Sequence, residues 1–267
     1  MEIKINNLTY IKEKKKILNN INHTFDEGIT AIMGYSCGKS TILKLINYLG
    51  KPTKGQIYIN NIKLTKGINI NKIRPKIGYL PQEKETSFFN RTVYEEVSFG
   101  LKHFKIKYNH QKKVSEALKL VGLNDNYINM NPFNLSYGEK TKLALACLLV
   151  TNPDIILLDE PTLGLDNQSK KNLINLLNEL KANKTIIINT NDIEFISKIT
   201  NNILVMDKGN IIYQGTLKDL YKNNIDNLAL PAELEFIKYV NQTKNIKLNY
   251  HNNINKLSKE IKNHVKK

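Results

Sequence analysis

The stretch that decides the fold is MGYSCGKST, residues 33–41. It follows the apolar residues Ile29, Ala31 and Ile32 and precedes apolar residues at helical spacing. A glycine-containing turn between a strand and a helix, closed by Gly-Lys-Ser, is the layout of a phosphate-binding loop, in which backbone N–H groups hold phosphate oxygens. The stretch therefore predicts that Lys39 reaches the terminal phosphates of a nucleotide and that the Ser40 hydroxyl binds Mg²⁺.

The predicted loop is one residue shorter than the usual spacing. The first glycine is expected five positions before Gly38, where Met33 stands, and Gly34 comes one residue later. Because a Gly-Lys-Ser triplet alone is weak evidence, the rest of the chain has to decide whether this is a nucleotide site.

Length and composition indicate one large domain, or a main domain with an appendix. The chain has 267 residues, of which 41% are hydrophobic, enough for a core. Its longest apolar runs fall well short of the roughly 20 residues of a membrane-spanning helix. Residues 1–4 show no signal-peptide layout, and two cysteines fit a reducing cytosol.

The net charge of +16 raises the question of a polyanionic partner. The excess is nearly all lysine, is spread along the chain and accompanies abundant Asn and Ile, which indicates a compositional bias. We therefore expect no nucleic-acid partner. The same positive charge would equally well favour binding to an anionic membrane surface.

Apolar periodicity predicts alternating strands and helices, which is typical of an α/β core with a parallel sheet. Capping boxes at Thr92/Glu95 and Ser136/Glu139 predict two helix starts. From about residue 222 the pattern weakens to two marginal helices, an appendix. The predicted strands cover about residues 2–10, 17–25 (after a turn at 12–16), 57–59, 77–80, 155–160, 186–188, 203–205 and 211–213, and the helices about 40–49, 92 onward, 114–121, 136–150, 173–180, 230–240 and 254–267.

Two positions have a functional and a structural interpretation. Asp159 and Glu160 end a buried strand, at the sheet edge where open α/β folds bind ligands. There one carboxylate can hold Mg²⁺ and the next can act on an attacking water; alternatively, the pair starts a solvated loop. Tyr10 either stacks on an adenine or is an ordinary strand aromatic.

Taken together, the ordered motifs resemble the nucleotide-binding ATPase subunit of an ABC transporter. The resemblance covers about residues 1–221, and the signature Tyr137, Ser98–Gly100 and the tail around Leu230-Pro231 are most similar to energy-coupling factor importers of vitamins or of cobalt and nickel. The matching segments are Lys39–Thr41 (Walker A), Gln82 (Q-loop), Leu135–Glu139 (signature), Ile155–Glu160 (Walker B), Gly164–Asp166 (D-loop) and Asn191-Asp192 (switch).

The resemblance implies a P-loop NTPase (RecA-like) α/β core with an antiparallel β subdomain, a helical ABC-specific insertion at about residues 83–150, and a small C-terminal extension over 222–267. It implies a peripheral protein on the cytoplasmic face of the membrane, bound to integral membrane transport subunits. ATP and Mg²⁺ would lie between two ATPase subunits, of one kind or two, arranged head to tail. The implied site residues are Glu160, Gln82 and Asn191 for catalysis, Tyr10, Gly34, Tyr35, Ser36, Cys37, Gly38, Lys39, Ser40, Thr41, Ser136 and Gly138 for the nucleotide, and Ser40, Gln82 and Asp159 for the metal.

Two departures from the family pattern fall on the same composite site. Asn191 stands where the family has histidine, and an amide neither carries a positive charge nor shuttles a proton. The short loop should lose at least one phosphate contact, worth on the order of 1.5–3 kcal/mol. We therefore expect slow hydrolysis, or none, at this chain's own site, while its signature serves the partner.

Two further functions stay open at the level of sequence. A soluble ABC ATPase acting on ribosomes or nucleic acid would use the basic charge, although such proteins usually carry two cores or a coiled coil. A regulatory subunit that binds ATP without turnover would differ only in its kinetics. The resemblance implies that other subunits choose the transported substrate.

Overall fold

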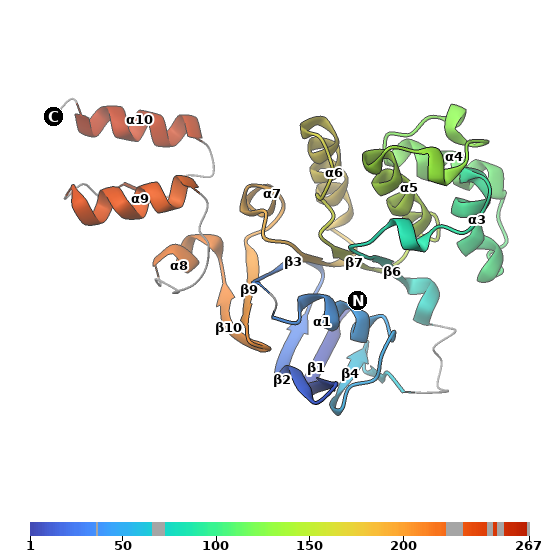
Figure 1. The fold of residues 1–267 in the computed structure, drawn as a ribbon, viewed down its shortest axis with the longest axis horizontal. Helices are drawn as coiled ribbons and strands as arrows, with labels where there is room; N and C mark the ends of the chain where they lie inside the picture. The colour runs from blue at the N-terminus through green and yellow to red at the C-terminus, as the bar shows by residue number, and fades with distance from the viewer. Residues whose placement is uncertain (36, 66–72, 223–231, 245–247, 250–253, 266–267) are drawn as a thin grey trace.

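The fold is built from two sheets with helices packed between and around them (Figure 1). The computed structural model describes residues 1–35, 37–65, 73–222, 232–244, 248–249 and 254–265. One sheet has six strands and is mainly parallel, and the other has four antiparallel strands. This arrangement confirms the predicted α/β core with an antiparallel β subdomain.

The six-stranded sheet has the order β10-β9-β3-β8-β7-β6, with only β10 antiparallel to its neighbour. Every residue of β7 and β8 is buried, as expected for parallel strands covered on both faces. The strands are β3 (Gly28–Met33), β6 (Ile77–Leu80), β7 (Ile155–Asp159), β8 (Thr185–Asn189), β9 (Asn202–Asp207) and β10 (Asn210–Gly215).

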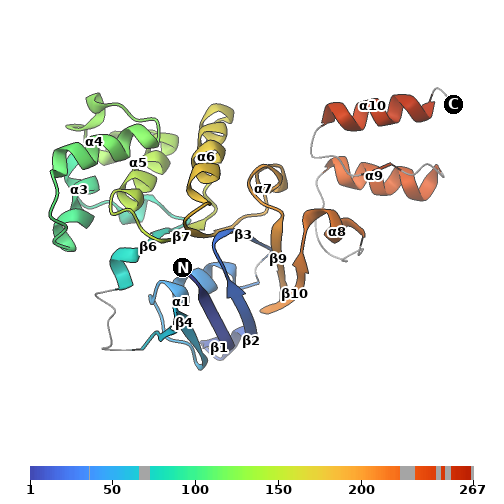
Figure 2. The same cartoon turned by 180° about the vertical axis from the view of Figure 1, so that it is seen from behind.

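The antiparallel sheet has the order β2-β1-β4-β5 and lies beside the first sheet (Figure 2). Asn60 and Asn61, between β4 and β5, both have positive φ, as a tight hairpin turn requires. The predicted turn at 12–16 is shorter in the structure, with Glu13 and Lys14 at positive φ between β1 and β2. The strands are β1 (Ile3–Lys12), β2 (Lys15–Phe25), β4 (Lys54–Ile59) and β5 (Ile62–Lys63).

Helix α1 (Lys39–Ile46) fills the space between the two sheets. Its residues Ile42 and Leu45 share one cluster with Ile5 of β1 and with Leu157 of β7. Since alternate strand residues face opposite sides, the neighbouring Leu158 instead packs against the helices beyond the sheet. The helix ends at Ile46, earlier than the predicted 49. The helix therefore packs between the two sheets directly after the loop that follows β3.

A group of helices forms the predicted insertion (Figure 1). These are α3 (Val93–His103), α4 (His110–Leu120) and α5 (Tyr137–Leu149). Both predicted capping boxes are present, one at the start of α3 and the other at the start of α5. Apolar residues of all three helices join the cluster that covers the second face of the six-stranded sheet.

The remaining helices flank the sheet and follow it. The sequence pattern did not predict helix α7 (Ile193–Ile199), because its 7 residues are too few to show a helical period. Helices α9 and α10 lie side by side, away from both sheets, and share a small cluster of Ile237, Leu248 and Leu257 (Figure 1). The predicted Leu230-Pro231 segment lies outside the described residues. None of the described helices has the length and apolarity to cross a bilayer. These helices are α6 (Asn167–Leu180), α7 (Ile193–Ile199), α8 (Leu217–Lys222), α9 (Ala232–Thr243) and α10 (Ile254–Val265).

Candidate nucleotide site

The parallel strands bring the predicted motifs to one edge of the sheet. Strands β3, β8, β7 and β6 are successive parallel neighbours, so their carboxyl ends meet at the same edge. The ends of these strands and the loops after them carry the phosphate loop, Asn191, the Asp159-Glu160 pair and Gln82. In open α/β sheets this edge is where ligands bind.

The short phosphate loop begins on a glycine that the fold requires. Gly34 follows β3 directly and has φ of 129°, a region that side chains rarely adopt. A Cβ at this position would lie 2.1 Å from the carbonyl oxygen of Met206 on β9. Tyr35 is 62% exposed, Cys37 is buried, and Ser36 lies outside the described residues. Gly34 stands one position later than the usual spacing, and its close approach to β9 requires a glycine there.

The start of α1 is suited to an anion. Gly38 is the N-cap in a left-handed conformation, and no side chain caps the first turn. The first amides of a helix have no partner within it, and with the helix dipole they favour a phosphate. Ser40 and Thr41 lie in this first turn and are half-buried. The residues present therefore fit a nucleotide phosphate.

Asn191 contacts the phosphate loop at two points. Its side-chain Oδ1 accepts hydrogen bonds from the Gly34 N–H at 2.9 Å and from Lys39 Nζ at 3.1 Å. Its Nδ2 donates to the Gly34 carbonyl oxygen at 3.4 Å. Two donors that a phosphate loop presents to its ligand are thus bonded to the chain's own amide group.

Lys39 also faces the catalytic candidate Glu160. Its Nζ lies 3.6 Å from Glu160 Oε1. Burial lowers the pKa of the Lys39 ammonium, and the neighbouring carboxylates of Glu160 and Asp159 oppose this shift. The structure therefore brings together the predicted phosphate-binding lysine, the predicted switch residue and the predicted catalytic carboxylate.

Asp159 has the setting of a metal-binding carboxylate. It ends β7, is only 2% exposed, and accepts a 3.3 Å hydrogen bond from Asn189 Nδ2 on the next strand. Mg²⁺ is usually held by one or two carboxylates together with substrate phosphates, so Asp159 and the Ser40 hydroxyl form a suitable donor set. Asn189 orients this carboxylate, and sequence reasoning missed it because it reads as the end of an apolar strand.

Glu160 has an unusual backbone. Its φ is 47°, in the left-handed region that costs a side-chain-bearing residue roughly 1–2 kcal/mol. Its N–H donates to the Asn189 carbonyl oxygen at 2.9 Å, and its own carbonyl oxygen accepts from Leu163 N–H at 3.3 Å. Such conformations persist where surrounding contacts hold them, and they cluster at functional sites.

The Q-loop presents Gln82 to solvent and buries a lysine two residues later. Gln82 is exposed beyond the end of β6, whereas Lys84 is only 1% exposed. Lys84 Nζ donates to the Glu160 carbonyl oxygen at 3.3 Å. Sequence reasoning missed Lys84, since Glu-Lys-Glu over residues 83–85 reads as a solvated charge run.

The signature residues lie on α5, away from α1 (Figure 1). Ser136 Oγ donates to Glu139 Oε2 at 2.7 Å and accepts from the Glu139 N–H at 3.3 Å. The hydrogen bond that Tyr127 donates to Glu139 lowers the pKa of this carboxyl group. Ser136 and Gly138 are therefore displayed at a helix start that does not reach this chain's own phosphate loop.

Tyr10 lies on β1 and packs, partly buried, against the core cluster around α1. Its hydroxyl is 4.0 Å from the place a Cβ would take on Gly50. Both interpretations of Tyr10 remain compatible with this position.

Comparisons with known proteins agree with this arrangement. Residues 18–163 match the family model described as ABC transporter. A putative ABC transporter ATP-binding protein of Pyrococcus horikoshii is 35% identical, over 94% of this chain and 96% of its own length. The energy-coupling factor transporter ATP-binding protein EcfA2 of Acetivibrio thermocellus is 34% identical, over 87% of this chain and 86% of its own.

Solved structures show the same fold. A dimeric bacterial ABC transporter cassette matches with a TM-score of 0.75 and 30% identity, over 80% of this chain and 98% of that chain. The same cassette is known as a dimer after hydrolysis, bound to ADP and Pi. The cbiO1 protein of Clostridium perfringens, part of an ABC transporter complex, matches with a TM-score of 0.73 and 32% identity, over 90% and 94% of the two chains. The chain belongs to the ABC transporter family and is one of its ATP-binding ATPase subunits.

Proposed function

We propose that this chain energises a membrane importer of vitamins or transition-metal ions through ATP-driven closure of an ATPase dimer. The support is the similarity to the energy-coupling factor protein EcfA2 and to cbiO1, along most of the chain in both cases. On this proposal the chain acts on the cytoplasmic face of the membrane, as a peripheral subunit.

Each residue of the site has a proposed role. Lys39 and the start of α1 bind the phosphates of ATP, Ser40 and Asp159 hold Mg²⁺ together with Gln82, and Glu160 acts on the attacking water. Mg²⁺ would supply charge neutralisation at the phosphates. The placement of Lys39 beside Glu160 at the carboxyl edge of the sheet, where β7 ends in the buried Asp159, supports the assignment.

A second ATPase subunit completes the site, because the signature of this chain lies away from its own phosphate loop. Nothing in the described part of the chain crowds Gly138, where a Cβ would make an ordinary 3.5 Å contact with the Gly164 carbonyl oxygen. A glycine that its own chain does not require fits close approach by a ligand held in the partner. The partner is a second copy or a related subunit.

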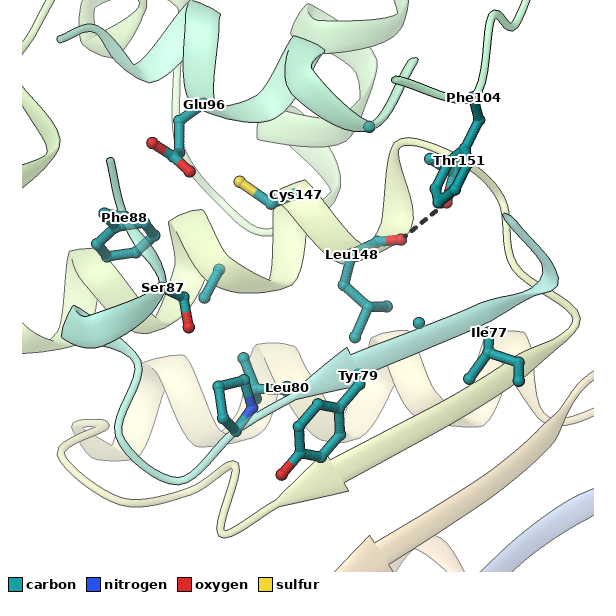
Figure 3. A pocket seen from close by; sticks show the side chains of 14 residues that line it. Ile77, Tyr79, Leu80, Ser87, Phe88, Glu96, Phe104, Cys147, Leu148 and Thr151 are labelled. Atoms are coloured by element: carbon teal, nitrogen blue, oxygen red, sulfur yellow. Dashed lines mark hydrogen bonds between the residues drawn. The ribbon is translucent and has the colours of Figure 1, made fainter. Parts of the chain in front are cut away.

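A hollow on the insertion supports a membrane partner (Figure 3). It lies between β6, α3 and α5, with Phe88 on one side and Phe104 and Thr151 on the other. The chain neighbours of the lining residues Phe88 and Gly100 are Phe89 and Phe99, and we call their exposed rings, which meet edge to face with centroids 4.8 Å apart, the rim. Glu96 fixes this rim by accepting hydrogen bonds from the N–H groups of residues 89 and 90. A hollow lined by apolar and polar side chains, beside an exposed pair of aromatic rings, fits an inserted helix of a transport subunit.

Turnover at this chain's own site is proposed to be slow. The carrying observation is Asn191, whose Oδ1 occupies the Gly34 N–H and Lys39 Nζ. Both donors must break their hydrogen bonds to Asn191 before they can bind phosphate. In addition, position 191 has no imidazole that could carry a positive charge or shuttle a proton. Glu160 is retained, so the expected defect is slow hydrolysis rather than failure to bind ATP.

The test is steady-state ATP hydrolysis by the isolated chain and by the chain reconstituted with its partner subunit. The proposal predicts low activity alone and higher activity in the pair, with Glu160→Gln in this chain changing the pair's activity little. Robust turnover by the isolated chain would contradict a slow site. Insertion of one glycine before Cys37, and separately Asn191→His, would show which departure limits the rate.

The rival function, an ABC ATPase acting on ribosomes or nucleic acid, is supported by the charge of +16. Affinity purification from cells distinguishes the two. Recovery of integral membrane proteins supports the importer, whereas recovery of RNA that withstands high salt would favour the rival.

A further inference from the structure

The buried Lys84 donates a hydrogen bond to the main chain of Glu160, the proposed catalytic residue. Lys84 is not among the site residues that the family resemblance implies. We propose that Lys84 is a positioning residue that holds Glu160 in its catalytic orientation. The proposal rests on the proposed role of Glu160 in hydrolysis, and it concerns how this chain keeps that residue in place.

The first contact is with the backbone of Glu160. Lys84 Nζ donates to the Glu160 carbonyl oxygen at 3.3 Å, and the same oxygen accepts from the Leu163 N–H. Glu160 is in the left-handed region, at φ of 47°. A hydrogen bond to the carbonyl of a strained residue resists rotation of its peptide, and the direction of the side chain depends on that rotation. Lys84 thus acts on the carboxylate through the main chain.

The second contact is with the signature tyrosine. Lys84 Nζ lies 5.4 Å from the centroid of the Tyr137 ring, a cation–π arrangement. Gly164 of the D-loop packs on this ring so closely that a Cβ would lie 2.0 Å from it. The ammonium group is therefore enclosed between Glu160 and the Tyr137 ring, which explains its burial.

The charges around Lys84 make its burial tolerable. The carboxylates of Glu160 and Asp159 are the acidic groups that act on it. Burial lowers the pKa of Lys84, and these two carboxylates raise it. A buried ammonium whose hydrogen bond goes to the carbonyl of a strained residue is costly to maintain, and positioning a catalytic group is a reason to keep it.

The test replaces Lys84 in the full chain, assembled with its partner ATPase and with Glu160 intact. Lys84→Met removes the donor and the charge at similar size, Lys84→Arg retains both, and Lys84→Gln is too short to reach the carbonyl. The control is Lys184→Met, directly before β8. Lys184 is 9% exposed and donates to Asn152 Oδ1 at 2.8 Å and to the Pro153 carbonyl oxygen at 2.6 Å, so it is a second buried lysine on carbonyl acceptors.

Two readouts are measured. The first is kcat and KM for MgATP at this chain's own site, measured in an assembly whose partner subunit has been made unable to hydrolyse ATP. In that assembly Lys84→Met should lower kcat by about 10-fold or more with KM changed less than about 3-fold, since a misplaced catalytic group costs rate rather than binding. Lys84→Arg should restore kcat to within about 3-fold of the native chain. The second is hydrogen–deuterium exchange of the peptide covering residues 155–166, which should be faster in Lys84→Met and unchanged in Lys184→Met.

The outcomes separate this proposal from the proposed function. Native kcat and native exchange in Lys84→Met would overturn the positioning role, as would an equal fall of kcat in Lys184→Met. If Lys84→Met does not fold, Lys84→Gln is measured against the same two criteria. If the native assembly binds ATP without turnover at this site, the proposed hydrolysis fails, and the exchange measurement alone decides the role of Lys84.

Discussion

At the scale of single residues, the hydrogen bonds of Asn191 to Gly34 and Lys39, after the end of β3, define the site. Asn191 Oδ1 takes two hydrogen bonds that a phosphate-binding loop normally offers to its ligand. The presence of a site could be predicted from the order of the motifs. The pairing of Asn191 with Gly34 and Lys39 could not, because it joins positions more than 150 residues apart and depends on the register of β3 and β8.

Removal of the Lys39 ammonium should weaken ATP binding. Lys39→Ala is expected to raise the Kd for MgATP by about 10- to 150-fold, the loss of one charge-assisted contact worth about 1.5–3 kcal/mol. Isothermal titration calorimetry measures this directly. Lys44→Ala, at an exposed position on the same helix, is the control and should bind as the native chain does. Equal Kd values for both variants would contradict the role of Lys39.

Gly34 should be far less tolerant of a side chain than Gly28. Both have positive φ, 129° and 106°, so alanine strains the backbone at each. Only at Gly34 would the new Cβ also meet a main-chain oxygen, at 2.1 Å, since nothing lies within 4 Å of a Cβ at Gly28. Gly34→Ala should lower the free energy of unfolding by about 1–3 kcal/mol more than Gly28→Ala. Urea denaturation compares the two, and equal losses would contradict the packing of Gly34 on β9.

At the scale of elements, the helices and strands were predictable where a local pattern carries them. The capping boxes of α3 and α5 are local hydrogen-bond devices, and both formed as their spacing predicts. Strands β7 and β8 read as continuous apolar runs because both faces are covered. No local sequence pattern indicates that Lys84 is buried. Its burial depends on Glu160 and Tyr137, which arrive from distant elements.

The capping carboxylate of α5 should stabilise the fold in a pH-dependent way. Tyr127 and Ser136 lower the pKa of Glu139, so the charged form is favoured in the native state. Its contribution is fully present above the unfolded-state value of about 4.3 and is lost as the pH falls through the lower native value. Glu139→Gln should therefore lower the free energy of unfolding by about 0.5–1.5 kcal/mol at pH 7 and by progressively less below pH ~4.

Urea denaturation of the native chain and Glu139→Gln at a series of pH values measures this difference. Glu116→Gln is the control, because Glu116 forms an exposed ion pair with Lys113 on α4, of the kind that contributes little. A difference between native chain and Glu139→Gln that stays constant from pH 7 to pH 3 would contradict the account of the cap.

At the scale of the whole molecule, the parallel sheet explains how motifs spread over some 150 residues form one site. The α/β class and the order of motifs could be predicted, since both follow from apolar runs and short signatures. The boundary near residue 221 stays a prediction, supported by the separate cluster that α9 and α10 share. The orientation of the helical group, which carries the signature away from α1, required the structure.

The rim of the hollow on the insertion should govern association with the membrane subunits. Phe99→Ala is expected to reduce co-purification of those subunits by about 10-fold or more, since truncating an exposed aromatic anchor at a contact commonly costs 1–2 kcal/mol or more. The Kd for MgATP should not change. Leu120→Ala, an exposed apolar residue on α4, is the matched control. Native recovery of membrane subunits with Phe99→Ala would contradict this surface as the docking site.

The most direct test of the central claim is the ATP turnover of the isolated chain compared with its Asn191→His variant, at saturating MgATP and equal occupancy by nucleotide. The account predicts that both proteins bind MgATP, that the native chain hydrolyses it slowly, and that the histidine raises kcat by about 100-fold or more, the lower end of what a positioned acid–base group contributes. Equal and rapid turnover by the two proteins would contradict the claim that Asn191 limits this site.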